Sequence, residues 1–362
     1  MIAATALPTA GFWIGKRVFL TGHTGFKGSW MLLALRELGA DVYGYSLAPD
    51  TIPSMFEAFG LDTLCAAHQI ADVRNFATLR DAVAAARPDV AIHMAAQPIV
   101  STGYEMPLET FDTNIMGTAN FLEACRQATV PLTIVVSSDK CYRNNETGLP
   151  FKEDDALGGK DPYSASKAGT EIAVAAWAAS FMNDAHGMRL ASGRAGNVIG
   201  GGDWSRDRLL PDAARAFSTG AAMHVRSPES IRPWQHVLEP VCAYLLLAEQ
   251  LADDPAMARG WNFGPVPSIG RSVRDVMDLA TAAWSNGVRW TSPEAVPAMD
   301  EAITLLLDSS DAHDRLGWTP RLSLDEAVNW TMKWYRDFHL DGAGAARNTT
   351  ARQIETYLSA GS

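Results

Sequence analysis

Short apolar runs alternate with longer amphipathic stretches along the first two hundred residues. The runs at residues 18–20, 42–47, 90–96 and 132–136 have the continuous apolar character of buried strands, and residues 29–38 and 111–127 have helical periodicity. Parallel strands that are covered on both faces give such runs, and they need crossover helices between them. The alternation therefore predicts an α/β fold with a doubly wound parallel sheet.

The pattern loosens after about residue 197 into stretches rich in Gly, Pro and Trp. A helix at 241–251 and a strand at 261–264 return to the sheet, and the last hundred residues show about six short helical patterns. We expect a cofactor-binding sheet domain of residues 12–196 plus about 232–265. Residues 197–231 plus 266–362 would form a smaller, mostly helical substrate lobe.

Composition narrows the choice of partners. The 362 residues suffice for about two domains, and 47% apolar with 20% charged residues is typical of a globular protein. The net charge of −11 disfavours nucleic acid and anionic membranes as partners. No apolar run is long enough for a membrane helix. Residues 1–15 lack a basic segment, so we expect a loose leader rather than a signal peptide.

Four widely spaced cysteines lack the CxxC pattern and have no metal-ligand spacing to any histidine. This distribution predicts a reduced, cytoplasmic protein without a metal site.

A glycine-rich turn, TGHTGFKG at residues 21–28, directly follows the first strand and precedes the first helix. Such a turn lets the backbone approach a pyrophosphate at the positive end of the helix, as in Rossmann-type dinucleotide sites. Its spacing is GxxGxxG rather than GxGxxG, and a tight turn without a ligand is the alternative interpretation. The candidate cofactor-binding residues here are Gly22, Thr24, Gly25, Phe26, Lys27 and Gly28.

The second strand ends at Ser46 with neither an acid for a ribose hydroxyl nor a cation for a 2′-phosphate. We therefore expect NAD, although Lys27 keeps NADP open. Asp72 and Val73 follow the third strand and are candidates for the adenine end, or Asp72 simply caps a helix. Small residues after the fourth strand, Ala95 and Ala96, and then Gln97 would let the cofactor run along the strand ends, whereas His93 within that strand reads as a core histidine.

Tyr163 and Lys167 lie one helical turn apart on one face of a predicted helix. A nearby cation favours a phenolate, so Tyr163 can accept a proton near neutrality. Ser138 stands at the carboxyl end of the fifth strand, where ligands of open α/β sheets gather. We expect Ser138, Tyr163 and Lys167 to form one hydrogen-bonded cluster over a nicotinamide.

With these motifs the chain resembles the extended short-chain dehydrogenase/reductase superfamily, and within it the nucleotide-sugar epimerases and dehydratases. The resemblance covers about residues 12–340 and is closest to the subfamily that dehydrates CDP-D-glucose. TGxxGxxG and YxxxK mark only the superfamily, whereas three strings are typical of the subfamily: SSDKCY (137–142), GNVIGGGDW (196–204) and IRPWQHV (231–237).

The resemblance implies NAD-dependent conversion of CDP-D-glucose to CDP-4-keto-6-deoxy-D-glucose and water, a step of deoxysugar biosynthesis. Tyr163, assisted by Lys167 and Ser138, would take the O4 proton. Asp139 would protonate the departing C6 hydroxyl and Lys140 would take the C5 proton. Lys140 can act as a base only when neutral, and the alternative is that it pairs with Asp139 or a phosphate. The acid–base pair distinguishes elimination from epimerisation, unless it is merely a solvated charge pair.

Further residues are expected around the sugar nucleotide. Arg232 is the preferred pyrophosphate clamp because a guanidinium binds phosphate in a planar, bidentate way. Asn114 would hold the catalytic geometry, or simply satisfy buried backbone groups. The candidate substrate-binding residues are Gln97, Asn197, Arg208, Arg232 and Trp234. Arg206 and Arg208 are alternatively surface charges, and Trp204 and Trp234 alternatively fill apolar space.

Two other functions stay open at this point: a related nucleotide-sugar 4-epimerase or dehydratase, and a non-catalytic NAD-binding sensor. A sensor would not need the acid–base groups. Relatives pair two helices into a four-helix interface, which predicts a homodimer through the helices around residues 108–127 and 163–182. The small and apolar residues there would equally suit packing on the sheet.

Overall fold

The computed structural model describes residues 5–182, 187–265, 270–285, 287–292 and 304–359. At its centre lies a seven-stranded sheet with strand order β11-β6-β5-β4-β1-β2-β3, in which every pairing is parallel. The strands are β1 (Arg17–Thr21), β2 (Asp41–Ser46), β3 (Ala67–Ile70), β4 (Val90–His93), β5 (Leu132–Val136), β6 (Arg189–Ala195) and β11 (Gly260–Phe263). Because the order reverses at β1, the predicted Rossmann-type doubly wound sheet is confirmed.

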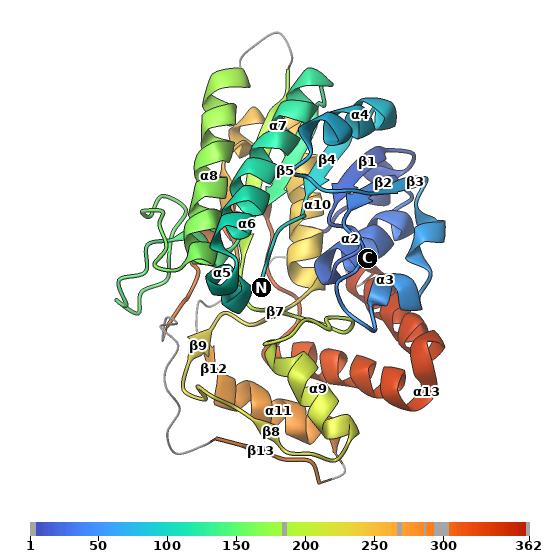
Figure 1. Ribbon diagram of the computed structural model, residues 1–362, viewed down its shortest axis with the longest axis vertical. Coiled ribbons are helices and arrows are strands. Elements are labelled where there is room, and N and C mark those ends of the chain that lie inside the picture. Colours follow the sequence, from blue (N-terminus) through green and yellow to red (C-terminus); the bar gives the residue numbers. More distant parts are fainter. Residues whose placement is uncertain (1–4, 183–186, 266–269, 286, 293–303, 360–362) are drawn as a thin grey trace.

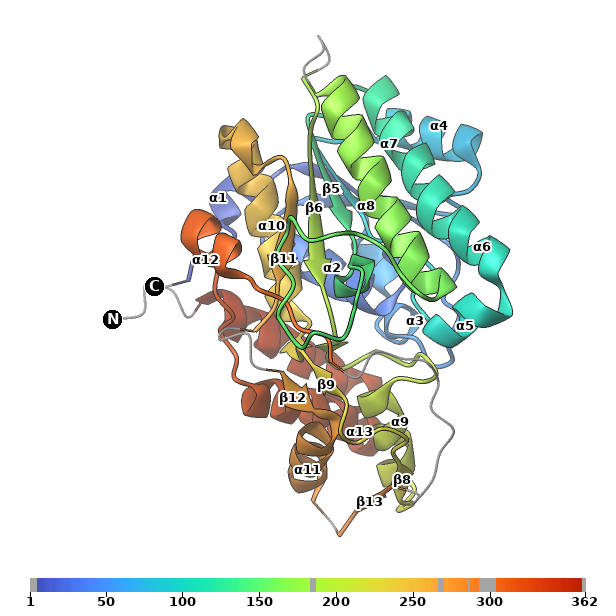
Figure 2. The same cartoon turned by 90° about the vertical axis from the view of Figure 1, so that its left-hand side faces the viewer.

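Side chains of β1 alternate between two cores, one on each face of the sheet. Val18 and Leu20 pack with the helices of one face, and Phe19 packs with those of the other. Figure 2 shows these two layers of helices. The first face carries α2 (Phe26–Glu37) and α10 (Leu238–Asp253), and the second carries α4 (Phe76–Ala86), α7 (Gly117–Gln127) and α8 (Pro162–Phe181). Burial on both faces explains why the strands read as continuous apolar runs.

Shorter elements form a mostly helical lobe beyond the carboxyl ends of the strands (Figure 1). Its helices are α9 (Leu209–Ser218), α11 (Val273–Trp284) and α13 (Leu324–Ser359), and its two-residue strands are β7 (Val198–Ile199), β8 (Met223–His224), β9 (Ile231–Arg232), β10 (Gln235–His236), β12 (Arg271–Ser272) and β13 (Trp290–Thr291). The smaller helical lobe is thereby confirmed. The predicted domain boundaries stay a prediction.

The remaining elements are short and lie around the sheet. They are α1 (Ala10–Trp13), α3 (Met55–Ala58), α5 (Val100–Glu105), α6 (Pro107–Phe111), α12 (Ser310–Leu316), the 3₁₀ turns η1 (Leu61–Leu64), η3 (Asp139–Cys141) and η4 (Pro255–Met257), and the π-helical turn η2 (Asp112–Met116). No described helix is both long and apolar enough to cross a membrane.

An aromatic cluster joins the lobe to the sheet domain. Trp204 is 7% exposed and packs edge-on to Tyr335, with ring centroids 5.2 Å apart, while Trp334 stacks on Phe338. Trp204 therefore fills apolar space, as its alternative interpretation held, rather than facing a ligand. Tyr335 donates a 2.5 Å hydrogen bond to the Asp203 carbonyl, which ties the Gly- and Trp-rich loop to α13.

The amino-terminal segment is not a loose leader, so that expectation is wrong for the described residues. Trp13 is fully buried, and its indole donates a 2.7 Å hydrogen bond to Glu249 on α10. The Thr5 hydroxyl donates to the Thr319 carbonyl at 2.8 Å. The sequence suggested a leader because Pro8 and Gly11 interrupt its apolar pattern, but a buried tryptophan is enough to fix the segment.

Three element boundaries also differ from expectation. The strand predicted at 90–96 ends at His93, because the Thr21 hydroxyl accepts the next N–H groups, those of Met94 and Ala95. The helix predicted at 111–127 is interrupted by η2. The described part of the last hundred residues holds three helices rather than about six, since α13 runs through 36 residues with a kink at Gly342.

A buried carboxyl joins α10 to the carboxyl-terminal helix. Glu239 is fully buried and accepts hydrogen bonds from the Tyr357 hydroxyl at 2.5 Å and from the backbone N–H groups of Arg321 and Leu322. Burial raises its pKa to about 7. Below that pH the folded protein holds a proton that the unfolded chain releases, so this contribution to stability is present at low pH and lost as the pH rises.

We expect Glu239→Gln to show this loss directly. Because Gln cannot ionise, the free energy of unfolding of the wild type should fall relative to the variant by about 3 kcal/mol between pH 4.5 and pH 7. Denaturant unfolding across this range measures the difference. Glu355→Gln, at an exposed position of α13, is the control. A difference between Glu239→Gln and the wild type that is constant across the range would contradict the assignment.

Candidate active site

The glycine-rich turn has the shape that a pyrophosphate needs. Gly22 adopts φ +75°, and a Cβ there would lie 2.7 Å from the backbone nitrogen of Ala95; a Cβ on Gly28 would overlap the Gly22 carbonyl. Helix α2 begins at Phe26, and its N-cap, Gly25, offers no side-chain acceptor to the first-turn N–H groups. Uncapped N–H groups at a helix N-terminus fit the pyrophosphate of a dinucleotide, which is the ligand expected here.

Phe26 and Lys27, in the first turn of α2, have different surroundings. Phe26 packs against the core beside α10. Lys27 points toward the catalytic residues, because its charge acts on both Asp139 and Lys167. Burial and the charge of Arg208 lower the pKa of Lys27 to about 8. No described residue forms a hydrogen bond or ion pair with its ammonium group.

At the end of β2 the Ser46 and Thr24 hydroxyls lie 2.9 Å apart, and Thr24 also donates to the Leu47 carbonyl. Asp72 accepts three hydrogen bonds from Arg74, and the side-chain ones hold its pKa below the usual value. The helix-cap interpretation of Asp72 is wrong, since Asn75 caps α4.

Asn114 joins the end of β4 to α8. Its carbonyl accepts the N–H of Gln97 at 2.8 Å, and its amide donates to the Gln97 carbonyl and to Ser166 at 2.8 Å. The π-helical turn η2 carries Asn114, which is fully satisfied by these partners, as its alternative interpretation held. The Gln97 amide donates to Thr110 and its carbonyl accepts from Ile99, so the side chain of Gln97 is also engaged within the protein.

Three other predicted residues line the strand ends. Ala95 and Ala96 follow β4 and are partly exposed, and Val73 is 4% exposed and close to Gly117. His93 is a core histidine, as expected. Its ring stacks on Phe121 at 4.6 Å, and burial lowers its pKa to about 3.

The predicted catalytic residues lie together where β5 ends beside the start of α8. The Ser138 hydroxyl donates to Asp139 Oδ1 at 2.9 Å, accepts the N–H of Lys140 at 3.2 Å and lies near enough to the Tyr163 phenol to lower its pKa. Lys167 follows one turn later on α8. Ser138 thus contacts both the proposed phenolic base and the proposed acid.

Burial shifts the pKa values of these groups toward one another. It raises the pKa of Asp139, which is 2% exposed, against the opposing charges of Lys140, Arg232 and Lys27. Burial and the charge of Lys27 lower the pKa of Lys167 to about 8.

The pKa of Tyr163 is also raised, mainly by burial, although the Ser138 hydrogen bond and the Arg208 charge oppose the rise. We expected a nearby cation to lower this pKa. The pKa is nevertheless raised, because loss of water destabilises the phenolate more than these neighbours stabilise it.

The Asp139 carboxylate rests against backbone. A Cβ on Gly196, the residue after β6, would overlap Asp139 Oδ2, and this oxygen is buried without a hydrogen-bond partner in the described structure. The absence of a side chain at position 196 therefore sets where the carboxyl group can lie. Motif reading singled out the string around Gly196 but assigned it no such contact.

The substrate-binding candidates surround this centre. Arg232 on β9 is 5% exposed and donates to the Ile231 carbonyl at 2.9 Å, and its charge reaches Asp139. Arg208 precedes α9, donates to the Pro98 carbonyl at 3.0 Å, and its charge reaches Tyr163. Arg206 is a surface charge, paired with Glu105.

Asn197 and Trp234 belong to the two segments that pair as β7 and β10. The Asn197 carbonyl accepts the N–H of Gln235, and its φ of +44° lies in the left-handed region that asparagine tolerates. The Trp234 indole donates to the Arg271 carbonyl at 3.0 Å. The roles of all these residues toward ligands stay predictions.

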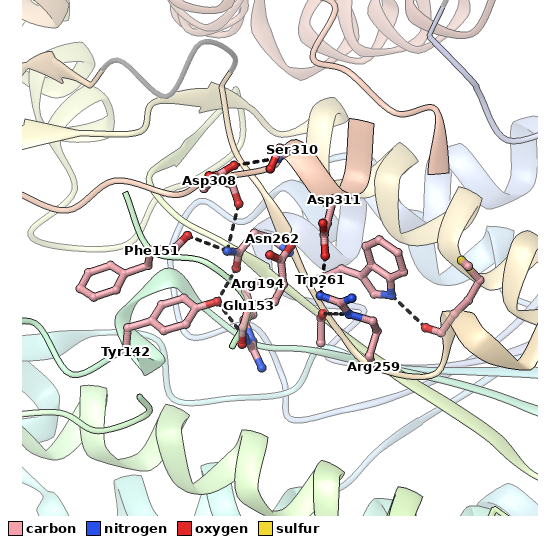
Figure 3. Close-up of polar contacts among 12 residues, drawn as sticks. Tyr142, Phe151, Glu153, Arg194, Arg259, Trp261, Asn262, Asp308, Ser310 and Asp311 are labelled. Atoms are coloured by element: carbon pink, nitrogen blue, oxygen red, sulfur yellow. Dashed lines mark hydrogen bonds and ion pairs between the residues drawn. The ribbon is translucent and has the colours of Figure 1, made fainter. Parts of the chain in front are cut away.

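Sequence reasoning missed a buried polar network behind the catalytic turn, drawn in Figure 3. Arg194 on β6 contacts Tyr142, and Tyr142 hydrogen-bonds Asn262 on β11. A partial signal existed, because Arg194 lies two residues before the string that begins at Gly196, and Tyr142 closes the string that contains Asp139. The described residues contain no group of His, Cys, Asp and Glu that could hold a metal ion.

Comparisons with known proteins agree with this geometry. The family model described as GDP-mannose 4,6 dehydratase matches residues 19–331. The chain is 46% identical over 332 residues to a CDP-glucose 4,6-dehydratase of Salmonella typhimurium, covering 90% of this chain and 92% of that protein. It is 25% identical over 334 residues to a dTDP-glucose 4,6-dehydratase of Streptomyces niveus, covering 89% of this chain and 93% of that one.

Among solved structures, the fold is similar to that of a UDP-glucose-4-epimerase from Stenotrophomonas maltophila with bound NAD and formylated UDP-arabinopyranose. The TM-score is 0.77 at 23% identity, covering 89% of this chain and 98% of that chain. Epimerase Mth375 of Methanothermobacter thermautotrophicus gives a TM-score of 0.78 at 18% identity, over 94% and 96% of the two chains. At such identities these structures establish the shared fold.

Proposed function

The chain belongs to the GDP-mannose 4,6-dehydratase family, and we propose that it converts CDP-D-glucose to CDP-4-keto-6-deoxy-D-glucose and water with NAD as its bound cofactor. The reaction is that of a hydro-lyase. The 46% identity to a CDP-glucose 4,6-dehydratase over nine-tenths of the chain supports the choice of nucleotide and sugar.

One observation carries the proposal: the Ser138 hydroxyl, which donates to the Asp139 carboxyl at 2.9 Å, also lies beside the Tyr163 phenol. Oxidation at C4 needs a base at the O4 hydroxyl, and loss of water from C5 and C6 needs an acid at the O6 hydroxyl. A sensor that only binds NAD needs neither group, and a 4-epimerase needs only the first.

The cofactor site fits NAD. Gly22 and Gly28 leave room for its pyrophosphate, and the uncapped N-terminus of α2 offers N–H donors. The end of β2 presents Ser46 and Thr24, hydroxyls without a cation, which supports NAD over NADP. When bound, the nicotinamide ring accepts a hydride from C4 of the sugar and later returns it to C6.

In the first half of the reaction, Tyr163 takes the proton of the O4 hydroxyl while the C4 hydrogen leaves as hydride. Lys167, one helical turn beyond Tyr163 on α8, would favour the phenolate through its positive charge, and Ser138 lies beside the phenol. The product is a 4-ketone. Its carbonyl acidifies the hydrogen on C5, so a weak base suffices for the next step.

In the second half, Lys140 takes the C5 proton and Asp139 gives its proton to the O6 hydroxyl, which leaves as water. Burial raises the pKa of Asp139, so the carboxyl group can hold the proton that this step requires. When the hydride reaches C6, Lys140 returns its proton to C5. Tyr163 has then gained one proton and Asp139 has lost one, and Ser138, which donates to Asp139 and lies beside Tyr163, offers the route that restores them.

The negatively charged diphosphate of the substrate needs local cations, because the protein carries a net charge of −11. Arg232 and Arg208 stand at the edge of the catalytic centre on the side of the lobe and suit this role. Asn197, Trp234 and Gln97 complete the proposed substrate-binding set. The four cysteines are free thiols, which supports a cytoplasmic location.

We also infer a homodimer through α6, α7 and α8. Large apolar side chains stand exposed on this part of the molecule: Leu108 is 86%, Met116 52% and Ile172 60% exposed. Figure 2 shows these helices along one flank of the protein, outside the sheet. Exposed apolar side chains gathered in this way are typical of a subunit interface.

The substrate is tested by incubating the purified enzyme with CDP-glucose, UDP-glucose and dTDP-glucose and measuring the absorbance of the 4-keto product in alkali. We expect product from CDP-glucose, and none with Tyr163→Phe, which lacks the phenolic base. Conversion of a substrate to its 4-epimer without keto product would favour an epimerase. Absence of keto product from CDP-glucose would overturn the proposed substrate.

Gly196→Ala tests the position of the acid. The added methyl group must displace the Asp139 carboxyl, so kcat should fall by about 100-fold while thermal stability changes little. Gly344→Ala is the matched control, since a Cβ there meets no atom within 4 Å. Unchanged kcat in Gly196→Ala would show that Asp139 need not occupy the observed position.

Sedimentation analysis tests the dimer. The wild type should sediment as a dimer and Ile172→Glu as a monomer, because the carboxylate would be buried unpaired at the interface. Leu340→Glu changes a side chain that is 72% exposed on α13, away from the proposed interface, and should stay dimeric. A monomeric wild type at micromolar concentration would contradict the inference.

A further inference from the structure

Helix α8 presents a third polar residue on its catalytic face. Tyr163, Lys167 and Glu171 are spaced four residues apart, so they lie on one side of the helix. Glu171 is 3% exposed and forms a buried ion pair with Arg194, Oε2 to Nη2 at 2.8 Å. The Ser192 hydroxyl donates to the same oxygen at 2.8 Å. The helix that carries the proposed base is thus fixed to β6 through charge.

The other nitrogen of the Arg194 guanidinium reaches the opposite side of the active site. Nη1 donates to the Tyr142 hydroxyl at 2.7 Å and to the Glu153 carbonyl at 2.8 Å, and the guanidinium lies over the Tyr142 ring. Tyr142 donates in turn to Asn262 Oδ1 at 2.6 Å (Figure 3). Gly260 leaves room for this arrangement, because a Cβ there would overlap the guanidinium.

Tyr142 directly follows the turn η3, which carries the proposed acid and base, Asp139 and Lys140. Arg194 therefore contacts two catalytic segments at once. One is α8, whose first turns carry Tyr163. The other is the catalytic turn, held at its carboxyl-terminal end by the Tyr142 hydroxyl.

A stabilising role alone does not account for this network. A buried ion pair contributes little net stability, because desolvation of both charges offsets their attraction. Arg194 has polar contacts with three different segments of the chain, at Tyr142, Glu153 and Glu171, and neutralising one charge would require only the last of them. Its planar guanidinium fixes directions as well as distances.

We propose that Arg194 and Tyr142 are positioning residues that hold the catalytic turn, and with it Asp139, in register with the Tyr163 face of α8. This inference rests on the proposed dehydratase function. Oxidation and elimination depend to different degrees on the contact between Arg194 and Tyr142. Tyr163 is set by α8 and by Ser138 at the end of β5, whereas Asp139 lies on the turn that the Tyr142 hydroxyl secures. Loss of that contact should slow elimination more than oxidation.

Tyr142→Phe removes only the hydroxyl and keeps the ring that stacks on Phe151 at 4.9 Å. We expect kcat to fall about 10-fold with KM nearly unchanged. Oxidation should continue while elimination lags, so the near-ultraviolet absorbance of reduced nicotinamide should rise on the enzyme during steady-state turnover. A purely structural role would slow both halves and give no such rise.

Tyr244→Phe is the matched control. Tyr244 on α10 lies against Gly193, the neighbour of Arg194 on β6. Its hydroxyl is buried without a hydrogen-bond partner in the described structure. The control should match the wild type in kcat and in cofactor absorbance. Both variants should melt within a few degrees of the wild type.

Arg194→Lys supplies the second measurement. Lysine keeps a positive charge opposite Glu171 but lacks the planar fork that reaches Tyr142. The absorbance of reduced cofactor should rise as in Tyr142→Phe. Combining Arg194→Lys with Tyr142→Phe should raise it little further, since both changes break the same contact between Arg194 and the Tyr142 hydroxyl.

The outcomes separate this inference from the proposed function. A wild type that dehydrates no nucleotide hexose overturns both. An active wild type together with a Tyr142→Phe variant that shows no rise in reduced cofactor, or the same rise in Tyr244→Phe, overturns the positioning role alone. If Arg194→Lys fails to fold, Tyr142→Phe and its control still decide the question.

Discussion

The site depends on the position of one group, the Ser138 hydroxyl, which donates to Asp139 and lies beside the Tyr163 phenol. It can contact Tyr163 and Asp139 only if the carboxyl end of β5 lies against the first turn of α8, and the parallel sheet provides this arrangement. Asp161 caps α8 through the Ser164 N–H at 2.9 Å, which fixes the point where the helix begins. The fold therefore acts on the chemistry mainly by holding two chain segments at hydrogen-bonding distance.

Burial then adjusts the acidity of what the fold has brought together. Loss of water raises the pKa of the Asp139 carboxyl and lowers that of Lys167 to about 8. The same physical effect moves an acid and a base toward neutrality from opposite sides, because in each case it penalises the charged form. Proton transfer between groups whose pKa values lie closer together needs less free energy. Burial thus favours the protonated Asp139 that the elimination step needs, whereas it opposes the Tyr163 phenolate.

The sequence was most informative where one local pattern sufficed. Apolar runs located β1, β2, β4 and β5, and the glycine spacing located the turn before α2. It was least informative where contacts join distant segments. Arg194 meets Tyr142 and Glu171 only because β6 lies between η3 and α8, and no local periodicity encodes that. The Gln97 side chain likewise donates to Thr110 of α6, a contact between separate segments that no local pattern predicts.

The charge near the catalytic turn is opposite in sign to the net charge of the protein. The chain carries 41 acidic and 30 basic side chains, so its overall field opposes the approach of a dinucleotide and a sugar nucleotide. Near the catalytic turn the balance is reversed: Lys27, Lys140 and Arg232 all act on the one carboxyl group of Asp139. Buried charges are screened much less than exposed ones, so this local excess outweighs the distant surface acids. The cations that can receive anionic ligands are thus the same ones that resist the rise in the pKa of Asp139, and binding and acid catalysis depend on a shared set of charges.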